Sequence, residues 1–302
     1  MTPAPSTTPH PAILYALPKD QVARSLGDFV IKAQEEALSK RSKFTLAVSG
    51  GSLANTLVEG LTSRAEVKWD KWVVFFADER VVPLDHEDSN YRIVHEGLFS
   101  KVPIPTQNIH PISTENLDDP EEVAHEYEKQ LMNEFAGKFL THPFFCFSGG
   151  GLIGKNAVAF PRFDLILLGA GPDGHTCSLF PGHDLLKEDS TWVSWLNDSP
   201  KPPSTRITLT YPVLNHAHKV AFVAIGEGKK DIIQKLLDHP ELGLPSSLVK
   251  PIPPGQVYWS VCRRGRSFPD SIHKERLQAL NYSTPPLPHK DSKRGCRKSQ
   301  NN

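Results

Sequence analysis

Cysteines and long apolar stretches are scarce in this chain of 302 residues. The four cysteines (Cys146, Cys177, Cys262 and Cys296) are far apart and form no C-x-x-C pair. Their spacing argues against a disulfide framework and a zinc site, and it fits a reducing compartment. No apolar run reaches the roughly 18 residues of a transmembrane helix. Residues 1–11 have no basic segment followed by an apolar core, so we expect a cytoplasmic protein without a membrane partner.

Net charge is absent as well, because 34 basic side chains balance 34 acidic ones. The balance is uneven along the chain. Residues 262–302 hold ten Lys or Arg and three Asp or Glu, a net charge of +7, which leaves the remainder at −7. An acidic body is poorly suited to nucleic acid, so we expect no nucleic-acid partner. We predict that the basic tail 262–302 and the N-terminus 1–12 are disordered.

What the chain does have is a regular alternation of apolar runs and helical patterns. Strands are predicted at 44–48, 72–77, 163–168, 206–210, 220–225 and 257–261, and helices at 20–40, from 53, and at 90–99, 120–135 and 228–237. This alternation predicts an α/β fold, a doubly wound and mostly parallel sheet flanked by helices, as in Rossmann-like proteins. We expect a single domain over 13–261. In such folds ligands bind at the carboxyl ends of the strands.

Residues 138–154 interrupt this alternation. The segment is apolar, aromatic and rich in glycine, which is unusual for an exposed loop. A Gly-Lys pair stands on each side of it, so its deletion leaves a short, continuous connection. We therefore treat it as an atypical insertion and hypothesise a retained intron or a gene-model artefact, which sequencing of the transcript tests.

The stretch 163–181 contains the strongest chemical signal. Its apolar run ends in a glycine-rich turn that carries His175, and an imidazole there suits proton transfer near neutral pH. The glycines also satisfy G-x-G-x-x-G, the dinucleotide motif. Pro172 lacks an N–H and Asp173 adds a negative charge, so both oppose a pyrophosphate. A structural turn with an exposed histidine remains the alternative.

The segment Ser49-Gly50-Gly51-Ser52 lies between a predicted strand and a predicted helix. Glycines allow close approach of the backbone to a ligand, and the first N–H groups of a helix favour an anion. A phosphate is the natural guest, and a simple tight turn is the alternative. No metal-binding pattern occurs near it.

Two arginines are further candidates for binding an anion. Arg80 ends the charged triplet that begins at Asp78, directly after a predicted strand. There an arginine can hold an anion or a developing oxyanion while the carboxylate orients water or a sugar hydroxyl, although a solvated loop has the same composition. Arg206 begins another predicted strand and is either a second phosphate clamp or an edge charge.

Taken together, these motifs resemble the 6-phosphogluconolactonase family of the glucosamine/galactosamine-6-phosphate isomerase superfamily. The resemblance runs from about Leu14 to Trp259. It is carried by Ser49–Ser52, Phe76–Pro83 with Ser89–Tyr91, Gly171–Pro181 and Arg206–Thr210. The resemblance implies hydrolysis of 6-phospho-D-glucono-1,5-lactone to 6-phospho-D-gluconate in the oxidative pentose phosphate pathway, with no metal or cofactor. A monomer or weak dimer is expected.

The resemblance also implies residue roles. His175 would deprotonate the water that attacks C1, and Asp78 would help to position that water or the imidazole. Arg80 would bind anionic groups of the substrate. The phosphate would lie at the turn that begins at Ser49, held by Gly50, Gly51, Ser52 and Arg206.

Two other functions stay open. Glucosamine-6-phosphate deaminases share the turn at Ser49, but they carry Asp-Glu-Tyr where this chain has Arg80 as the third residue, and Asn-Glu-Pro where it has Ser178–Pro181. An inactive phosphosugar-binding protein with a basic nucleic-acid-binding tail is the other possibility. The chain also departs from the family after Trp259, where the usual terminal helix is replaced by the basic tail.

Overall fold

The computed structural model describes residues 12–17, 19–135, 160–225, 229–252 and 256–262. The chain divides into two units, Met1–Arg266 and Ser267–Asn302, and all described residues belong to the first. The insertion at 138–154 and nearly all of both predicted disordered ends lie outside the described residues. The predictions about them stay predictions.

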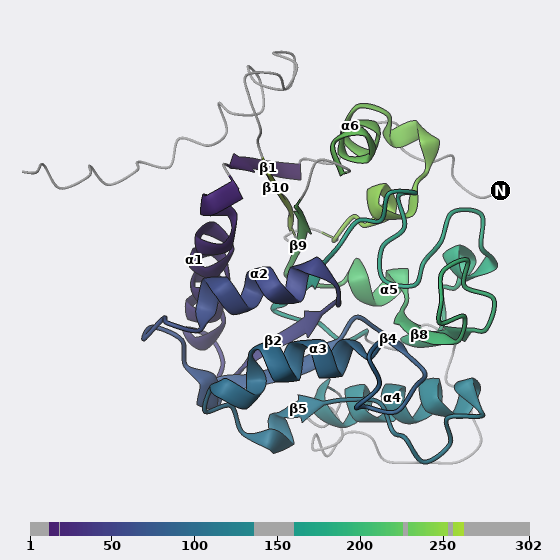
Figure 1. Cartoon of the computed structure of the whole chain (residues 1–302), viewed down its shortest axis with the longest axis horizontal. Helices are drawn as coiled ribbons and strands as arrows, with labels where there is room; N and C mark the ends of the chain where they lie inside the picture. Colours follow the sequence, from purple (N-terminus) through teal and green to yellow (C-terminus); the bar gives the residue numbers. More distant parts are fainter. Residues whose placement is uncertain (1–11, 18, 136–159, 226–228, 253–255, 263–302) are drawn as a thin grey trace, which may run out of the picture. The chain divides into compact units, whose positions relative to one another are not determined.

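Within the described residues, a seven-stranded sheet forms the centre of the fold (Figure 1). Its order is β1-β10-β9-β6-β2-β3-β5, and every neighbouring pair is parallel. The strands are β1 (Ala12–Leu17), β2 (Phe44–Val48), β3 (Trp72–Phe76), β5 (Ile109–His110), β6 (Leu165–Leu168), β9 (Lys219–Ala224) and β10 (Gln256–Cys262). The prediction of a doubly wound, mostly parallel α/β sheet is confirmed.

Helices cover both faces because the buried strands are apolar on both sides. One face packs against α1 (Lys19–Leu38), α2 (Ser52–Leu61) and α3 (Asn90–Gly97), with Leu46, Val74 and Leu167 in the shared core. On the other face, Phe75 meets Tyr127 of α4 (Pro120–Phe135) with ring centroids 6.1 Å apart. Two further helices follow, α5 (Tyr211–Leu214) and α6 (Lys230–Asp238). No helix in the described part of the chain has the length and apolarity to span a bilayer.

A second, smaller sheet lies apart from the parallel one. It is antiparallel, in the order β4-β8-β7, with β4 (Asp78–Arg80), β7 (Val193–Leu196) and β8 (Arg206–Leu209). The predicted strand at 206–210 therefore exists, but outside the parallel sheet. The charged triplet at 78–80 was expected as a strand end and is itself a strand. Its pairing sets Arg80 opposite Arg206.

Candidate functional site

The functional site lies where the winding of the sheet reverses. Strands β2 and β6 are neighbours, with Leu46 paired to Leu165. After β2 the chain continues to β3 and β5 on one side, and after β6 it continues to β9 and β10 on the other. The loops that leave these two strands diverge and leave a crevice at their carboxyl ends, the usual ligand position in open α/β sheets.

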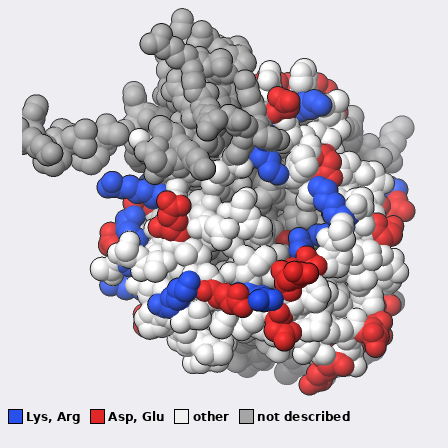
Figure 2. All heavy atoms as spheres, in the orientation of Figure 1, with Lys and Arg blue, Asp and Glu red and all other residues white. Residues whose placement is uncertain are grey.

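A cavity of about 200 Å³ occupies this crevice. It brings together all eight residues nominated from the sequence, which are Ser49, Gly50, Gly51, Ser52, Asp78, Arg80, His175 and Arg206. Figure 2 shows Lys and Arg side chains beside a hollow near the middle of one face of the molecule. Asn90 and Lys229, which no sequence pattern marked as site residues, also line the cavity.

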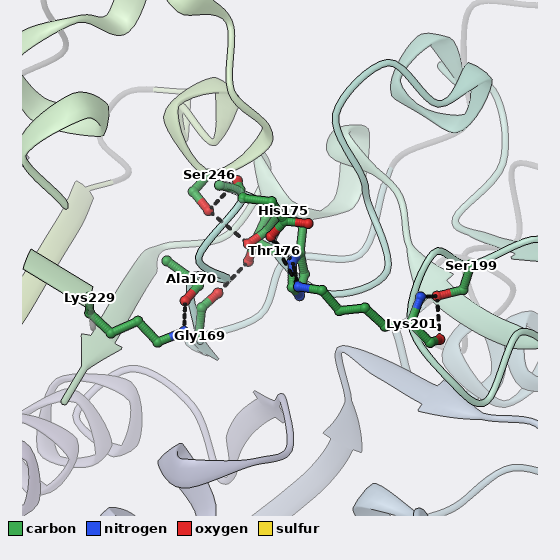
Figure 3. Close-up of polar contacts among 10 residues, drawn as sticks. Gly169, Ala170, His175, Thr176, Ser199, Lys201, Lys229 and Ser246 are labelled. Carbon is green, nitrogen blue, oxygen red and sulfur yellow. Dashed lines mark hydrogen bonds and ion pairs between the residues drawn. The ribbon is translucent and has the colours of Figure 1, made fainter. Parts of the chain in front are cut away.

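The turn after β6 holds His175 in a fixed backbone. Gly174 adopts φ +86°, a left-handed conformation that favours glycine. The amide of Gly171 donates to the carbonyl oxygen of His175 at 2.8 Å. Ser246 Oγ donates to the carbonyl oxygens of Gly174 and His175 at 2.9 and 3.1 Å (Figure 3). The loop before β10 thus locks the histidine's backbone.

The imidazole of His175 has an acidic partner. Its Nδ1 lies 2.5 Å from Asp173 Oδ1, and Lys201 Nζ lies 3.1 Å from the same oxygen and 3.0 Å from Nδ1 (Figure 3). Two acceptors cannot approach to 2.5 Å, so we assign the proton to Nδ1, which donates to Asp173. Lys201 then pairs with the carboxylate. This tautomer leaves Nε2 with a free lone pair, as a general base requires.

Protonation states in this turn suit a base at neutral pH. Burial lowers the pKa of His175 below its usual value, and the nearby Lys201 lowers it further, although Asp173 works in the other direction. Partial burial raises the pKa of Asp173, but its interactions with His175 and its hydrogen bond with Lys201 together outweigh burial and lower the pKa to about 2. A neutral imidazole next to an ionised carboxylate is therefore the expected state.

The carboxylate of Asp78 is held by two serine hydroxyls. Its Oδ1 accepts from Ser49 Oγ at 2.6 Å, and its Oδ2 accepts from Ser178 Oγ at 3.2 Å. Asp173, and not Asp78, contacts the imidazole directly, and the expectation that Asp78 helps to position the water or the imidazole stays a prediction. Asp78 acts on His175 through its charge, which favours the imidazolium. Its two hydrogen bonds connect the turns after β2 and β6.

The middle residue of the charged triplet is structural. Glu79 is 1% exposed. Its carboxylate accepts from the amides of Arg80, Asn90 and Tyr91 at 2.7 to 2.8 Å, which fixes the start of α3. Burial raises the pKa of Glu79 to about 7, because these neutral donors offset only part of the cost of charging it. Arg80 keeps a buried Nε with no partner among the described residues.

The turn after β2 offers a helix terminus to an anion. Gly51 is the N-cap of α2, with φ +73°, and no side chain caps the helix. A Cβ at Gly51 would meet no atom within 4 Å, so the left-handed backbone, not crowding, requires glycine. The first amides of a ten-residue helix therefore face the cavity uncapped, in the arrangement that binds phosphate in many proteins.

Three cationic side chains line the same cavity against a single carboxylate, Asp78. Arg206 is 3% exposed, and its Nε and Nη2 donate to the carbonyl oxygens of 201–203, which leaves Nη1 without a hydrogen bond among the described residues. Burial and the neighbouring Arg80 lower the pKa of Arg206. Lys229 donates to the carbonyl oxygen of Ala170 at 2.7 Å (Figure 3), and burial lowers its pKa. Such a cavity favours an anionic ligand.

Cys177 also borders the cavity, but its chemistry is different. Complete burial raises the pKa of its thiol well above the usual value. A protonated thiol is a poor nucleophile, which points to proton transfer by His175 instead of covalent catalysis by Cys177. Among the described residues, no three His, Cys, Asp or Glu side chains gather in a way that could hold a metal ion.

Comparisons with known proteins agree with this geometry. Residues 18–259 match the family described as glucosamine-6-phosphate isomerases/6-phosphogluconolactonase. A probable 6-phosphogluconolactonase of Schizosaccharomyces pombe is 47% identical over 233 residues, which are 76% of this chain and 84% of the relative. A probable chloroplastic 6-phosphogluconolactonase 3 of Oryza sativa subsp. indica is 42% identical over 222 residues, and the match spans 72% of this chain but only 63% of that relative. The solved structure of 6-phosphogluconolactonase from Thermotoga maritima superposes with a TM-score of 0.68 at 26% identity, covering 83% of this chain and 100% of that one.

Proposed function

Because the chain belongs to the family of glucosamine-6-phosphate isomerases and 6-phosphogluconolactonases, we propose that it hydrolyses 6-phospho-D-glucono-1,5-lactone to 6-phospho-D-gluconate in the oxidative pentose phosphate pathway. One observation supports this proposal above the others. An imidazole that donates Nδ1–H to Asp173 lies in a cavity that also holds an uncapped helix terminus and three cations. A base and an anion site in one cavity are what hydrolysis of a phosphorylated lactone requires.

The chemistry begins with water. His175 Nε2 takes a proton from the water as its oxygen attacks C1, and Asp173 stabilises the imidazolium that forms. The tetrahedral intermediate carries a negative charge on the former carbonyl oxygen, which Arg80 stabilises. When the bond between C1 and the ring oxygen breaks, the imidazolium returns its proton to that oxygen. The products are a hydroxyl group and a carboxylic acid, which releases its remaining proton to solvent and becomes the carboxylate.

The phosphate group of the substrate orients the lactone in the cavity. We assign it to the α2 terminus at Gly50, Gly51 and Ser52, with Arg206 as a clamp and Lys229 as an additional cation. Binding of this remote group holds C1 near the base, so its binding energy lowers the barrier at the reacting centre. Ser49 has a supporting role through its hydrogen bond to Asp78.

The direct test is hydrolysis by the purified protein. We expect 6-phosphogluconate to form well above the spontaneous rate when the lactone is supplied, measured through NADPH production by a coupled dehydrogenase. Glucosamine 6-phosphate, tested in parallel, is expected to release no ammonia, which separates the lactonase from the deaminase. A spontaneous rate only, or ammonia release, contradicts the proposal.

We also propose that the enzyme acts in the cytoplasm. It binds a small phosphosugar lactone and uses no metal, cofactor or nucleic acid. We propose one domain over 13–261 and a monomer or weak dimer. Sedimentation over a range of protein concentrations tests the oligomeric state. Salt-dependent RNA binding that disappears when 262–302 is removed would favour the nucleic-acid alternative.

A further inference from the structure

Asn90 is the first residue of α3. Of the two polar atoms of its carboxamide, only the nitrogen has a hydrogen-bond partner among the described residues. The residue is 1% exposed and lines the cavity. Its Nδ2 donates to the carbonyl oxygen of Asp78 at 2.9 Å. Its Oδ1 has no hydrogen-bond partner among the described residues. A buried carbonyl oxygen without a donor is unfavourable, so this atom marks a place for a donor from the ligand.

The position of this oxygen is fixed from three sides. A reversed amide would set Oδ1 against the carbonyl oxygen of Asp78, so the orientation follows from that hydrogen bond. The backbone amide of Asn90 donates to Glu79 Oε1 at 2.7 Å, which holds the residue at the start of α3. A Cβ at Gly50 would lie 1.7 Å from Oδ1, so the oxygen lies close against the anion-binding turn. Gly50 is therefore required to admit the carboxamide.

An acceptor at this position selects its partner by chemistry. A phosphate dianion and a lactone carbonyl offer only acceptor oxygens, which Oδ1 repels. The ring hydroxyls are the donors that a phosphosugar lactone brings. Arg80, which also lines the cavity, presents the converse case, because its buried Nε is a donor without a partner among the described residues. A hydroxyl can donate as well as accept, so it is the group of the ligand that suits an unpaired acceptor beside cationic donors.

We propose that Asn90 is a specificity-determining residue that accepts a hydrogen bond from a ring hydroxyl of the phosphosugar lactone. This inference rests on the proposed lactonase function. It means that the site recognises the sugar separately from the phosphate and from the reacting carbonyl. A substrate that lacks the recognised hydroxyl leaves Oδ1 unpaired and is discriminated against.

The test compares substrates within each enzyme variant. We would measure kcat/KM for the parent lactone and for its 2-, 3- and 4-deoxy analogues, with the wild type and with Asn90→Ala. The wild type is expected to prefer the parent over one analogue by about tenfold or more, and Asn90→Ala to reduce that preference by about 3- to 10-fold. The ratio of two substrates is independent of how much of the variant folds, because both substrates meet the same folded molecules.

Two further variants sharpen the result. Gly50→Ala is expected to displace the carboxamide and to weaken the same preference while Asn90 is intact. Asn215→Ala is the matched control, because Asn215 Oδ1 already accepts from the Lys250 amide at 2.6 Å outside the cavity, and it should keep the wild-type ratios. If Asn90→Ala keeps the wild-type preference for the parent over every analogue, the proposal is wrong and Oδ1 accepts no hydrogen bond from a ring hydroxyl. A wild type that does not hydrolyse the parent lactone at all overturns the proposed function first, and this inference with it.

Discussion

The turn after β6 and the segment from β4 to α3 each hold an acidic residue whose surroundings shift its pKa, and the two shifts have opposite directions. Asp173 pairs with His175 and Lys201, is 35% exposed, and has its pKa lowered to about 2. Glu79 is fully buried and meets backbone amides and a hydroxyl, and its pKa is raised to about 7. A lysine, an imidazole N–H and some solvent keep the first carboxylate charged, whereas neutral donors only partly offset deep burial of the second. The first acid can therefore orient a base at neutral pH, and the second holds the end of a helix.

The largest effect is expected from removal of the base itself. His175→Ala leaves the β6 turn without a proton acceptor, so we expect kcat for the lactone to fall by at least about 10²-fold. Far-ultraviolet circular dichroism and the melting temperature should stay near the wild-type values, because the turn is held by backbone hydrogen bonds. Near-wild-type turnover would remove His175 from the mechanism.

Removal of the charge beside the base has the next largest effect. Asp173→Asn keeps a polar group at the imidazole but no longer stabilises the imidazolium, so we expect kcat to fall between about 10- and 100-fold. Asp173 raises the pKa of His175, so its loss should also move the acid limb of the pH–rate profile to lower pH. The pH profile of kcat/KM measures the shift.

The control for this variant is another carboxylate near the site. Asp78→Asn should also lower the histidine pKa, because Asp78 raises it through charge alone. It should do so by a smaller amount, since only Asp173 contacts the ring. An equal or larger shift with Asp78→Asn would contradict the assignment of Asp173 as the partner of the imidazole.

The acid in the β4–α3 segment should affect stability more than chemistry. The folded-state pKa of Glu79 lies above its ordinary value of 4.5, so the protonated form is favoured in the folded protein. Glu79 therefore contributes stability at low pH that is lost as the pH rises from about 4.5 to 7. Glu79→Gln should abolish this loss, which is roughly 3 kcal/mol for a pKa raised from 4.5 to about 7. Urea unfolding of both proteins at pH 5 and 7.5 measures it, and identical pH slopes would contradict the argument.

Sequence patterns predicted the framework well and the small sheet poorly. The runs that became β2, β3 and β6 are apolar on both faces, which is typical of buried parallel strands. By contrast, β4 is a charged triplet, and its strand character comes only from antiparallel pairing with β8, which no local pattern reveals. The strand β1 was not predicted either, although Ala12–Leu17 is a short apolar run, and it pairs with β10 from the other end of the chain.

For the site, the sequence identified the groups but not all of their pairings. All eight nominated residues line one cavity. Seven of them follow β2, β3 or β6, whose ends meet at one sheet edge, whereas Arg206 is brought there by the pairing of β8 with β4. Asp173 was judged only as a charge that opposes a nucleotide, yet it lies two residues from His175 in a tight turn. Lys229 follows β9, a neighbour of β6, so it could have been predicted from the tendency of ligands to bind at the carboxyl ends of parallel strands. Lys201 reaches the site from a loop whose path only tertiary structure determines.

The cross-strand pairing of Arg80 with Arg206 brings two positive charges together in the folded protein. Two guanidinium groups on adjacent strands repel each other, and Arg80 adds to the effect of burial in lowering the pKa of Arg206. An anion between them relieves this repulsion, so ligand binding and folding are thermodynamically linked. A ligand at 100 times its Kd adds about 2.7 kcal/mol to the stability of a folded protein. The protein should therefore melt at a higher temperature in phosphate than in chloride of equal ionic strength, even where no lactone is present.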